Sequence, residues 1–250
     1  MVHPENTTRV LVTGASRGIG RSIALSLAGD HDVAVNYRTS EEAAADVVDA
    51  IRRKGSNAVS VAADVGDSAA VESMMATVVD ALGGLDAVVN NAGTVDPALA
   101  TETGDERWNR VLDTNLTGAF YVTRAALPHL EPDGDVVFVS SIGGTDGTVD
   151  ASYAATKAGL HGLTRSLARG YGDSGLQVNA VAPGPVETEM NDEIVEYLGT
   201  IDFRGHGDVD THLPEYACQP EDVAHTVRYL PENEYVQGDV INVNGGMQFR

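Results

Sequence analysis

Near its start the chain runs from an apolar strand pattern through a glycine-rich turn into a helix pattern. Residues 9–13 form the apolar run, residues 14–20 read Gly-Ala-Ser-Arg-Gly-Ile-Gly, and Ile23, Ala24 and Leu27 then recur at helical spacing. Strand and helix patterns keep alternating along the rest of the sequence, and parallel strands need such helical crossovers. The alternation predicts an α/β fold with a doubly wound parallel sheet of about seven strands and helices on both faces.

We expect residues 1–250 to form a single domain, because no internal repeat or linker interrupts the alternation. Residues 189–217 lack a clean period and mix acids with glycine and histidine, so we interpret them as a mobile lid. The expected strands are residues 9–13, 33–35, 58–62, 86–89, 136–139, 177–181 and 240–243. The first expected helix begins after residue 20. The others are expected at residues 39–54, 67–82, 105–130, 151–167 and 220–230.

The glycine turn is suited to binding a dinucleotide. Glycines let the backbone approach a pyrophosphate, which the free amides and positive dipole end of the next helix also favour. The spacing is GxxxGxG, and a purely structural turn is the alternative. Asn36, Tyr37 and Arg38 follow the second strand pattern, where an NAD site usually has an acid for the ribose. Arg38 and Arg17 instead favour the 2′-phosphate of NADP, the alternative being two solvated surface arginines.

Tyr153 and Lys157 are four residues apart in an alanine-rich helix pattern, so their side chains share one face. A neighbouring ammonium favours phenolate and should lower the tyrosine pKa from about 10, as a proton donor and acceptor requires. Ser141 follows the strand pattern at 136–139 and could hydrogen-bond a substrate oxygen. The alternative for the pair is an exposed tyrosine and lysine on an ordinary helix. Asn115 interrupts a helix pattern for which it is poorly suited, with solvent exposure as the simple explanation.

The chain is strongly acidic, with 16 basic and 37 acidic side chains and a formal net charge of −21. This balance opposes nucleic acid or an anionic membrane as a partner. The acids are spread along the sequence, which suggests adaptation to a salt-rich cytoplasm; the alternative is a merely acidic enzyme. A single cysteine, Cys218, and the lack of an export or membrane segment also predict a cytoplasmic protein.

Taken together, these motifs resemble the short-chain dehydrogenase/reductase family over essentially the whole chain. That likeness implies a compact Rossmann fold. The matching positions are residues 13–20, Asp64 and Val65, residues 90–93, Asn115, Ser141, Tyr153, Lys157, Asn179, residues 183–184 and Thr188.

The resemblance also implies roles for these residues. Tyr153 would be the general acid, Ser141 would polarise the carbonyl, Lys157 would lower the tyrosine pKa and hold the nicotinamide ribose, and Asn115 would support a proton-relay water. The cofactor-binding residues expected are Gly14, Ser16, Arg17, Gly18, Ile19, Gly20, Tyr37, Arg38, Asp64, Val65, Asn91, Ala92, Gly93, Tyr153, Lys157, Pro183, Gly184, Val186 and Thr188.

The serine position has an alternative. The family often places the serine thirteen residues before the tyrosine, which fits Ser140, whereas Ser141 lies twelve before Tyr153. We assign Ser141 because Gly144 then keeps the register of the motif. Ser140 stays open.

Within the family, residues 36–38, 181–188 and 243–247 are most similar to 3-oxoacyl-thioester reductases. The likeness implies NADPH-dependent reduction of a 3-oxoacyl thioester, such as acetoacetyl-CoA, to the (R)-3-hydroxyacyl product. Another NADP-dependent secondary-alcohol, diol or sugar dehydrogenase is the alternative, and a non-catalytic NADP-binding regulator is a further one. A homotetramer is expected by the same likeness.

We expect coenzyme A rather than an acyl carrier protein to bring the acyl group. Related reductases meet acidic carriers with arginines at two places, where this chain has Glu131-Pro-Asp133 and Gly172-Asp-Ser174. Arg204 is a candidate cation for the phosphates of coenzyme A. His206, Asp208, Asp210 and His212 could ligate a metal, but a solvated acidic loop explains them better and we expect no metal.

Overall fold

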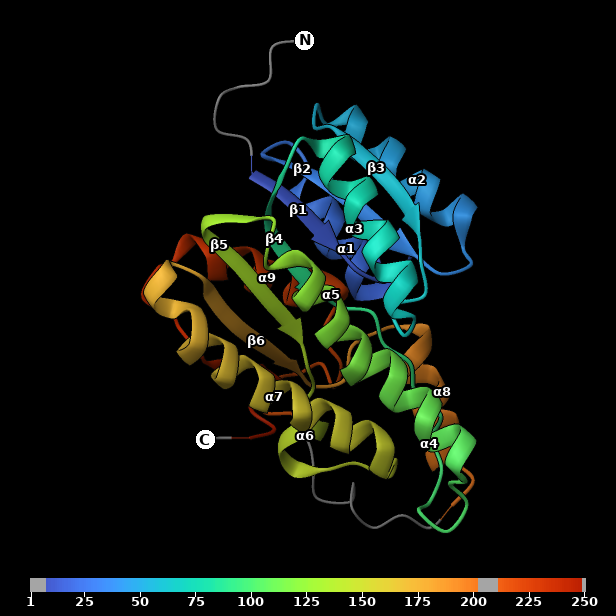
Figure 1. Ribbon diagram of the computed structural model, residues 1–250. Helices are drawn as coiled ribbons and strands as arrows, with labels where there is room; N and C mark the ends of the chain where they lie inside the picture. The colour runs from blue at the N-terminus through green and yellow to red at the C-terminus, as the bar shows by residue number, and fades with distance from the viewer. Residues whose placement is uncertain (1–7, 202–210, 249–250) are drawn as a thin grey trace.

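The computed structural model describes residues 8–201 and 211–248, and these residues hold one sheet of seven strands. The strands are β1 (Thr8–Val12), β2 (His31–Tyr37), β3 (Ala58–Ala62), β4 (Leu85–Asn90), β5 (Leu130–Val139), β6 (Gln177–Pro183) and β7 (Val240–Val243). Their spatial order is β3-β2-β1-β4-β5-β6-β7, and every neighbouring pair is parallel (Figure 1). The predicted α/β class, with a doubly wound parallel sheet, is confirmed.

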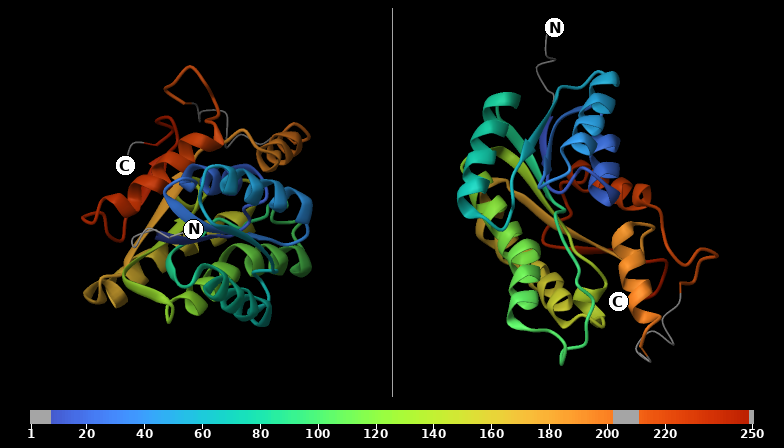
Figure 2. Two further views of the ribbon diagram at one scale, coloured as in Figure 1. Left: turned by 90° about the horizontal axis from the view of Figure 1, so that it is seen from above. Right: turned by 90° about the vertical axis from the view of Figure 1, so that its right-hand side faces the viewer.

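Helices cover both faces of the sheet (Figure 2). The covering helices are α1 (Gly18–Leu27), α2 (Glu41–Arg53), α3 (Ser68–Leu82), α5 (Gly118–Ala126), α7 (Ala151–Tyr171) and α9 (Pro220–Glu232). Val10 and Val12 of β1 belong to a buried cluster with α1, α2 and α9, whereas Leu11 packs with α3 and α5 on the other face. The cluster of α7 with β5 and β6 continues that second layer. Among the described residues, no helix is long and apolar enough to cross a membrane.

The strand order reverses at β1, which has β2 on one side and β4 on the other. The crossovers on the two sides of this point run in opposite directions, so the loops after β1 and β4 separate at the carboxyl edge of the sheet. A crevice at that edge is where ligands of doubly wound sheets bind. The fold therefore brings the glycine turn after β1 and the Asn90-Asn91 segment after β4 to one place.

A helix is found where residues 105–130 were expected to form one, but it ends at Ala126, and the expected end at residue 130 was wrong. It consists of α4 (Asp105–Leu112), a π-helical turn (Asp113–Thr117) and α5, which follow one another without a break. Pro128 has no backbone N–H with which to continue the helix. As a result β5 begins at Leu130, earlier than the strand expected at 136–139.

The interpretation of residues 189–217 as aperiodic was also wrong for its first part, because α8 spans Glu189–Leu198. The Thr188 side chain accepts a hydrogen bond from the Asn191 amide, and acids in the first turn suit the helix dipole. Within α8, all of which is described, no residue is buried. Met190, Ile194 and Leu198 nevertheless recur at helical spacing and are partly buried, so this helix pattern was present in the sequence and was missed. Residues 202–210 lie outside the described residues.

Candidate active site

The glycine turn after β1 packs tightly against the segment after β4. Gly14 has a φ of +61°, and a Cβ added there would lie 2.9 Å from Ala92 Cα. A Cβ added at Gly20 would lie 2.3 Å from Asn91 Nδ2 and 2.4 Å from Gly14 O. No L side chain fits at either position without moving backbone, so these glycines set how closely β1 and β4 approach the start of α1.

Two asparagines hold this turn. Asn91 Nδ2 donates to the carbonyls of Thr13 (2.9 Å) and Gly14 (3.1 Å), while Thr13 Oγ1 accepts from the amides of Asn91 and Ala92, each at 3.0 Å. On the other side Asn36 Oδ1 accepts from the Gly14 amide at 3.2 Å. The positioning role of Asn36 was missed from the sequence, where it marked only the end of a strand. Its Nδ2 donates to the carbonyls of Tyr37, Val61 and Ala63, so the side chain joins the glycine turn to the end of β3.

The N-terminus of α1 opens into a cleft of about 470 Å³ that extends to Tyr153 and Lys157. Arg17, the N-cap residue, is extended, and within the described part of the chain no side chain caps the first amides of α1. Free amides, a positive dipole end and backbone without Cβ atoms form the binding surface that a pyrophosphate requires. The residues present therefore fit a dinucleotide cofactor.

Most of the expected cofactor residues line this cleft. They are Gly14, Ser16, Arg17, Gly18, Ile19, Gly20, Tyr37, Arg38, Asp64, Val65, Asn91, Ala92, Gly93, Tyr153, Lys157 and Thr188. Three others do not: Val186 is buried in the core, Pro183 ends β6, and Gly184 packs against Asn244, 3.1 Å from a Cβ built at that glycine. Lining residues missed from the sequence are Asn36, Thr39, Ser40, Ala63, Thr94, Val95, Thr114, Val139, Ser140, Glu187, Glu189, Met190 and Glu193.

Both predicted arginines stand at the mouth of the cleft. Arg38 lies 3.8 Å from the Asp64 carboxylate, and Arg17 lies 3.6 Å from Glu189 at the start of α8. Their side chains are 61% and 73% exposed, respectively, so these ion pairs are in high-dielectric surroundings and weak. Either guanidinium could turn to a phosphate at little cost.

Tyr153 and Lys157 project from the first two turns of α7. Lys157 Nζ lies 5.4 Å from the centre of the Tyr153 ring and donates to Val139 O at 2.8 Å. Ser141 accepts from the Gly143 amide at 3.0 Å and is hydrogen-bonded to the Tyr153 hydroxyl. The three predicted side chains thus meet where β5 ends against α7.

The two serines have different hydrogen-bond partners, and Ser140 rather than Ser141 is among the residues that line the cleft. Ser140 Oγ donates to the main-chain carbonyl of Lys157 at 3.0 Å and lies 2.8 Å from His161 Nε2. The single hydroxyl proton of Ser140 is therefore bonded to the Lys157 carbonyl, so His161 Nε2 must be the donor in its hydrogen bond with Ser140 Oγ. Ser141 is the serine beside the phenol, so it stays our candidate for binding a carbonyl oxygen.

The expected lowering of the tyrosine pKa is not found. Burial raises the pKa of Tyr153 to about 12; a hydrogen bond from Ser141 lowers it and the Asp150 charge raises it. Burial also lowers the pKa of Lys157 to about 8. The prediction from sequence included the effect of the Lys157 ammonium on the Tyr153 pKa. It could not include the burial of both side chains, which disfavours their charged forms.

Asn115 is buried in the π-helical turn, so the explanation by solvent exposure was wrong. Its Oδ1 accepts from the Thr94 amide at 2.8 Å, and its Nδ2 donates to Thr94 O at 2.9 Å and to Thr156 Oγ1 at 3.3 Å. The side chain joins the cleft segment after β4 to α7. π-Helical turns often mark functional sites, and an asparagine inside a helix pattern was the sequence signal for this one.

The possible metal ligands can be followed only in part. His206, Asp208 and Asp210 lie outside the described residues, as does Arg204. Within the described ranges, no group of three or more His, Cys, Asp or Glu side chains is arranged to hold a metal ion.

Comparison with known proteins agrees with this geometry. Residues 8–198 match the sequence model of the short chain dehydrogenase family. The chain is 41% identical over 248 residues to the 3-oxoacyl-[acyl-carrier-protein] reductase FabG of Staphylococcus aureus, covering 96% of this chain and 98% of that protein. A 3-oxoacyl-[acyl-carrier-protein] reductase from Synechocystis is 38% identical, with 95% of each chain covered.

Solved structures show the same similarity. A short chain dehydrogenase from Burkholderia cenocepacia, in complex with NADP, superposes with a TM-score of 0.86 at 35% identity, covering 96% of this chain and 97% of that one. A dehydrogenase/reductase from Sinorhizobium meliloti gives a TM-score of 0.85 at 34% identity, covering 97% and 95%. The chain belongs to the short-chain dehydrogenase family of oxidoreductases.

Proposed function

We propose that the protein reduces a 3-oxoacyl thioester to the (R)-3-hydroxyacyl thioester with NADPH. The observation that carries the proposal is that Tyr153 and Lys157 line a cleft suited to a dinucleotide, with Ser141 beside the Tyr153 hydroxyl. The names of the similar reductases support the thioester, and the NADP bound to the Burkholderia protein supports the cofactor.

NADPH would supply the hydride when bound. The amides at the start of α1 would hold its pyrophosphate, and Arg17 and Arg38 would bind its 2′-phosphate. Ser141 donates a hydrogen bond to the substrate carbonyl oxygen, which gains negative charge as it is reduced. The Tyr153 hydroxyl gives that oxygen its proton. A pKa of about 12 keeps this phenol protonated at neutral pH, the form that reduction uses.

Lys157 and Asn115 assist this step from behind the phenol. The Lys157 ammonium approaches the Tyr153 ring and stabilises the phenolate left after proton transfer. The polar atoms of the Asn115 side chain are taken up by Thr94 and Thr156, so it acts by holding the segment after β4 rather than by binding water with its amide. The α8 helix, with Met190 and Glu193 on the cleft, is the first part of the proposed substrate lid at residues 189–217.

A substrate panel tests this function. Acetoacetyl-CoA, longer 3-oxoacyl thioesters, sugars and diols would each be assayed with NADPH and with NADH. We expect the thioesters to have the highest kcat/KM and chiral analysis to find the (R) product. A sugar or diol used more efficiently would replace the substrate assignment. NADPH binding without turnover of any compound would favour the regulator.

Coenzyme A is the expected carrier of the acyl group. Like charges slow the encounter with an acidic carrier protein and disfavour docking. Both acidic segments lie at the amino-terminal edge of the sheet, Glu131-Pro-Asp133 within β5 and Gly172–Ser174 before β6, opposite Tyr153. Their negative charge therefore repels a carrier protein that extends to this edge of the sheet. In the homotetramer that the family resemblance implies, a carrier bound at a neighbouring subunit could also meet this edge.

The measurement is kcat/KM for acetoacetyl-CoA against the same acyl group on a carrier protein, at equal salt. We expect the coenzyme A form to be favoured, and Asp173→Arg to raise only the carrier-protein value. Asp49→Arg on α2 makes the same charge change elsewhere and serves as the control. A carrier-protein substrate that is preferred by the unaltered chain contradicts the charge argument.

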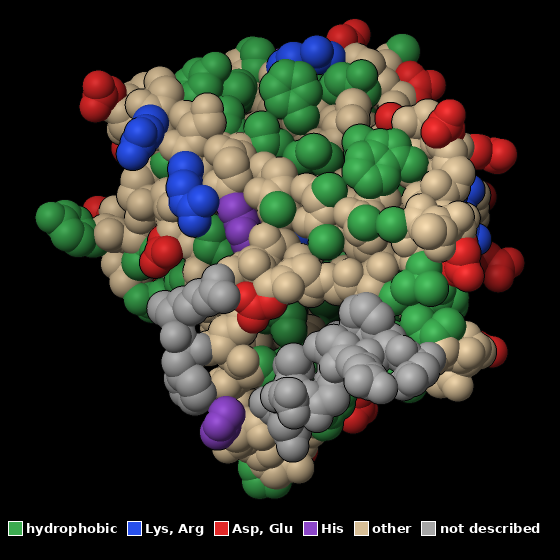
Figure 3. Space-filling view, turned by 90° about the horizontal axis from the view of Figure 1, so that it is seen from below, with side chains coloured by type: hydrophobic (Ala, Val, Ile, Leu, Met, Phe, Trp, Pro, Cys, Tyr) green, Lys and Arg blue, Asp and Glu red, His purple; other side chains and the backbone are tan. Residues whose placement is uncertain are grey.

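Adaptation to high salt is the proposed reason for the net charge of −21. Acidic side chains lie on several sides of the face shown in Figure 3 rather than in one patch. At about 1 M salt the screening length falls to about 3 Å, so their repulsion is largely removed. We expect Tm to rise from low salt into the molar range of KCl, followed by circular dichroism. KCl is preferred to sulfate, which strengthens burial in any protein. A Tm that stays constant or falls over this range would contradict the proposed adaptation to a salt-rich cytoplasm.

A further inference from the structure

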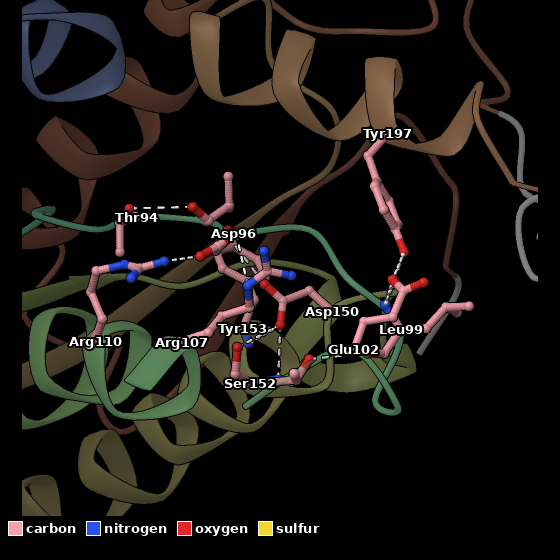
Figure 4. Close-up of polar contacts among 12 residues, drawn as sticks. Thr94, Asp96, Leu99, Glu102, Arg107, Arg110, Asp150, Ser152, Tyr153 and Tyr197 are labelled. Atoms are coloured by element: carbon pink, nitrogen blue, oxygen red, sulfur yellow. Dashed lines mark hydrogen bonds and ion pairs between the residues drawn. The ribbon is translucent and has the colours of Figure 1, made fainter. Parts of the chain in front are cut away.

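Asp150 is the N-cap residue of the helix that carries Tyr153, and it is 3% exposed. Its Oδ1 accepts three hydrogen bonds, from Ser152 N (2.9 Å), Ser152 Oγ (2.5 Å) and Tyr153 N (3.1 Å) (Figure 4). The tyrosine backbone is thus bound directly to a buried carboxylate. Rotation or fraying of the first turn of α7 would have to break this set together.

The second oxygen of the same carboxylate reaches another element. Asp150 Oδ2 accepts from the Asp96 amide at 3.4 Å, in the loop between β4 and α4 (Figure 4). The Asp96 side chain pairs in turn with Arg107, at 3.2 Å, and with Arg110 of α4. Asp150 therefore joins the first turn of α7 to a loop that is itself anchored to α4.

The charge of Asp150 faces the reacting group. The charged and titratable groups that contact or act on it are Tyr153 on α7 and Asp96 on the facing loop, whose charge Arg107 and Arg110 offset. Within the described part of the chain, no lysine or arginine forms an ion pair with Asp150. Backbone amides, the Ser152 hydroxyl and the positive end of the α7 dipole stabilise it instead, and the part of its negative field that reaches the phenol raises the pKa of Tyr153.

We propose that Asp150 is a positioning residue for the reaction, holding the first turn of α7 against the Asp96 loop so that the Tyr153 hydroxyl stays at Ser141. This inference rests on the proposed reductase function. The negative charge of Asp150 has a second effect, because a carboxylate beside a phenol disfavours the phenolate form and raises the pKa of Tyr153. Asp150 thus keeps the proton donor both placed and protonated.

The test uses Asp150→Asn and Asp150→Ser, since both residues are good N-caps without charge. Removing the negative charge lowers the pKa of Tyr153, so phenolate forms at lower pH. For oxidation of the 3-hydroxyacyl thioester, which needs phenolate, we expect the acidic limb of kcat/KM to move down by at least about 0.5 pH unit. Asp150→Ala also removes the cap, and we expect a fall in kcat of about tenfold or more at unchanged KM for NADPH.

Asp67 provides a matched control. It is the N-cap residue of α3, where its side chain accepts from the amides of Ala69 and Ala70. Asp67→Asn and Asp67→Ala should alter Tm without moving the pH profile. Profiles for Asp150→Asn and Asp150→Ser that match the unaltered chain would show that Asp150 is only a cap. The pH profile of kcat/KM is measured with a compound of the substrate panel that the unaltered chain turns over. If the unaltered chain turns over none of them, the proposed function fails, and this result is distinct from a failure of the Asp150 proposal.

Discussion

Replacing Tyr153 with phenylalanine is expected to lower kcat at least about a hundredfold, the scale for loss of a positioned acid, while NADPH still binds. The change removes one hydroxyl and keeps the buried ring, so the contact with Lys157 and the packing of α7 are retained. The remaining Ser141 hydroxyl can still polarise a carbonyl but has no low-energy way to deliver a proton. Steady-state turnover and NADPH fluorescence titration measure the two effects separately.

Tyr171→Phe is the control for this change. Tyr171 lies at the other end of α7, is 43% exposed and belongs to no part of the cleft lining. It should leave both kcat and NADPH binding unaltered. Near-normal turnover in Tyr153→Phe would remove Tyr153 from the mechanism, whatever the control shows.

The fold was predictable because the five inner strands of the sheet are covered by helices on both faces. The run at residues 9–13 is apolar throughout because Val10 and Val12 pack on one helical layer and Leu11 on the other. The helix α8 was missed because its few apolar residues stand among many acids, although Met190, Ile194 and Leu198 recur at helical spacing. Thr188 and the acids after it also carried a local helix-start signal.

The candidate site was predictable as a set of residues but not as a set of contacts. Tyr153 and Lys157 are neighbours by helix geometry alone, so their spacing sufficed. The partners of Asn115, in contrast, are Thr94 and Thr156, which lie 21 and 41 residues away in sequence. No local pattern encodes such a contact. The desolvation that raises the pKa of Tyr153 is likewise a property of the assembled core.

The two serines illustrate the same limit. Spacing to the tyrosine fits Ser140 and motif register fits Ser141, because one loop residue more or less satisfies either. The side chains are distinguished only by what surrounds them: Ser140 is bound to Lys157 O and His161, and Ser141 to Tyr153. His161 had no recognisable role in the sequence, although it is one of the two partners of the Ser140 hydroxyl.

Arg38→Asp is expected to lower kcat/KM for NADPH by at least about a hundredfold and to raise it for NADH. Arg38 stands at the end of β2 on the cleft, where a guanidinium can form charge-assisted bonds to the 2′-phosphate. Losing such a bond and adding repulsion costs about 3 kcal/mol, or roughly a hundredfold. A carboxylate at the same place can instead accept from the ribose 2′-hydroxyl of NADH.

Arg38 is paired with Asp64 at 3.8 Å, so the introduced carboxylate also faces a second acid. Salt screens this repulsion, and NADPH and NADH must therefore be compared at one ionic strength. Arg53→Asp, an equal charge change at the end of α2 and outside the cleft lining, controls for the general effect of added negative charge. An enzyme that uses both cofactors equally, before and after Arg38→Asp, contradicts the NADP assignment. A loss for NADPH in both variants would trace the effect to net charge rather than to a phosphate contact.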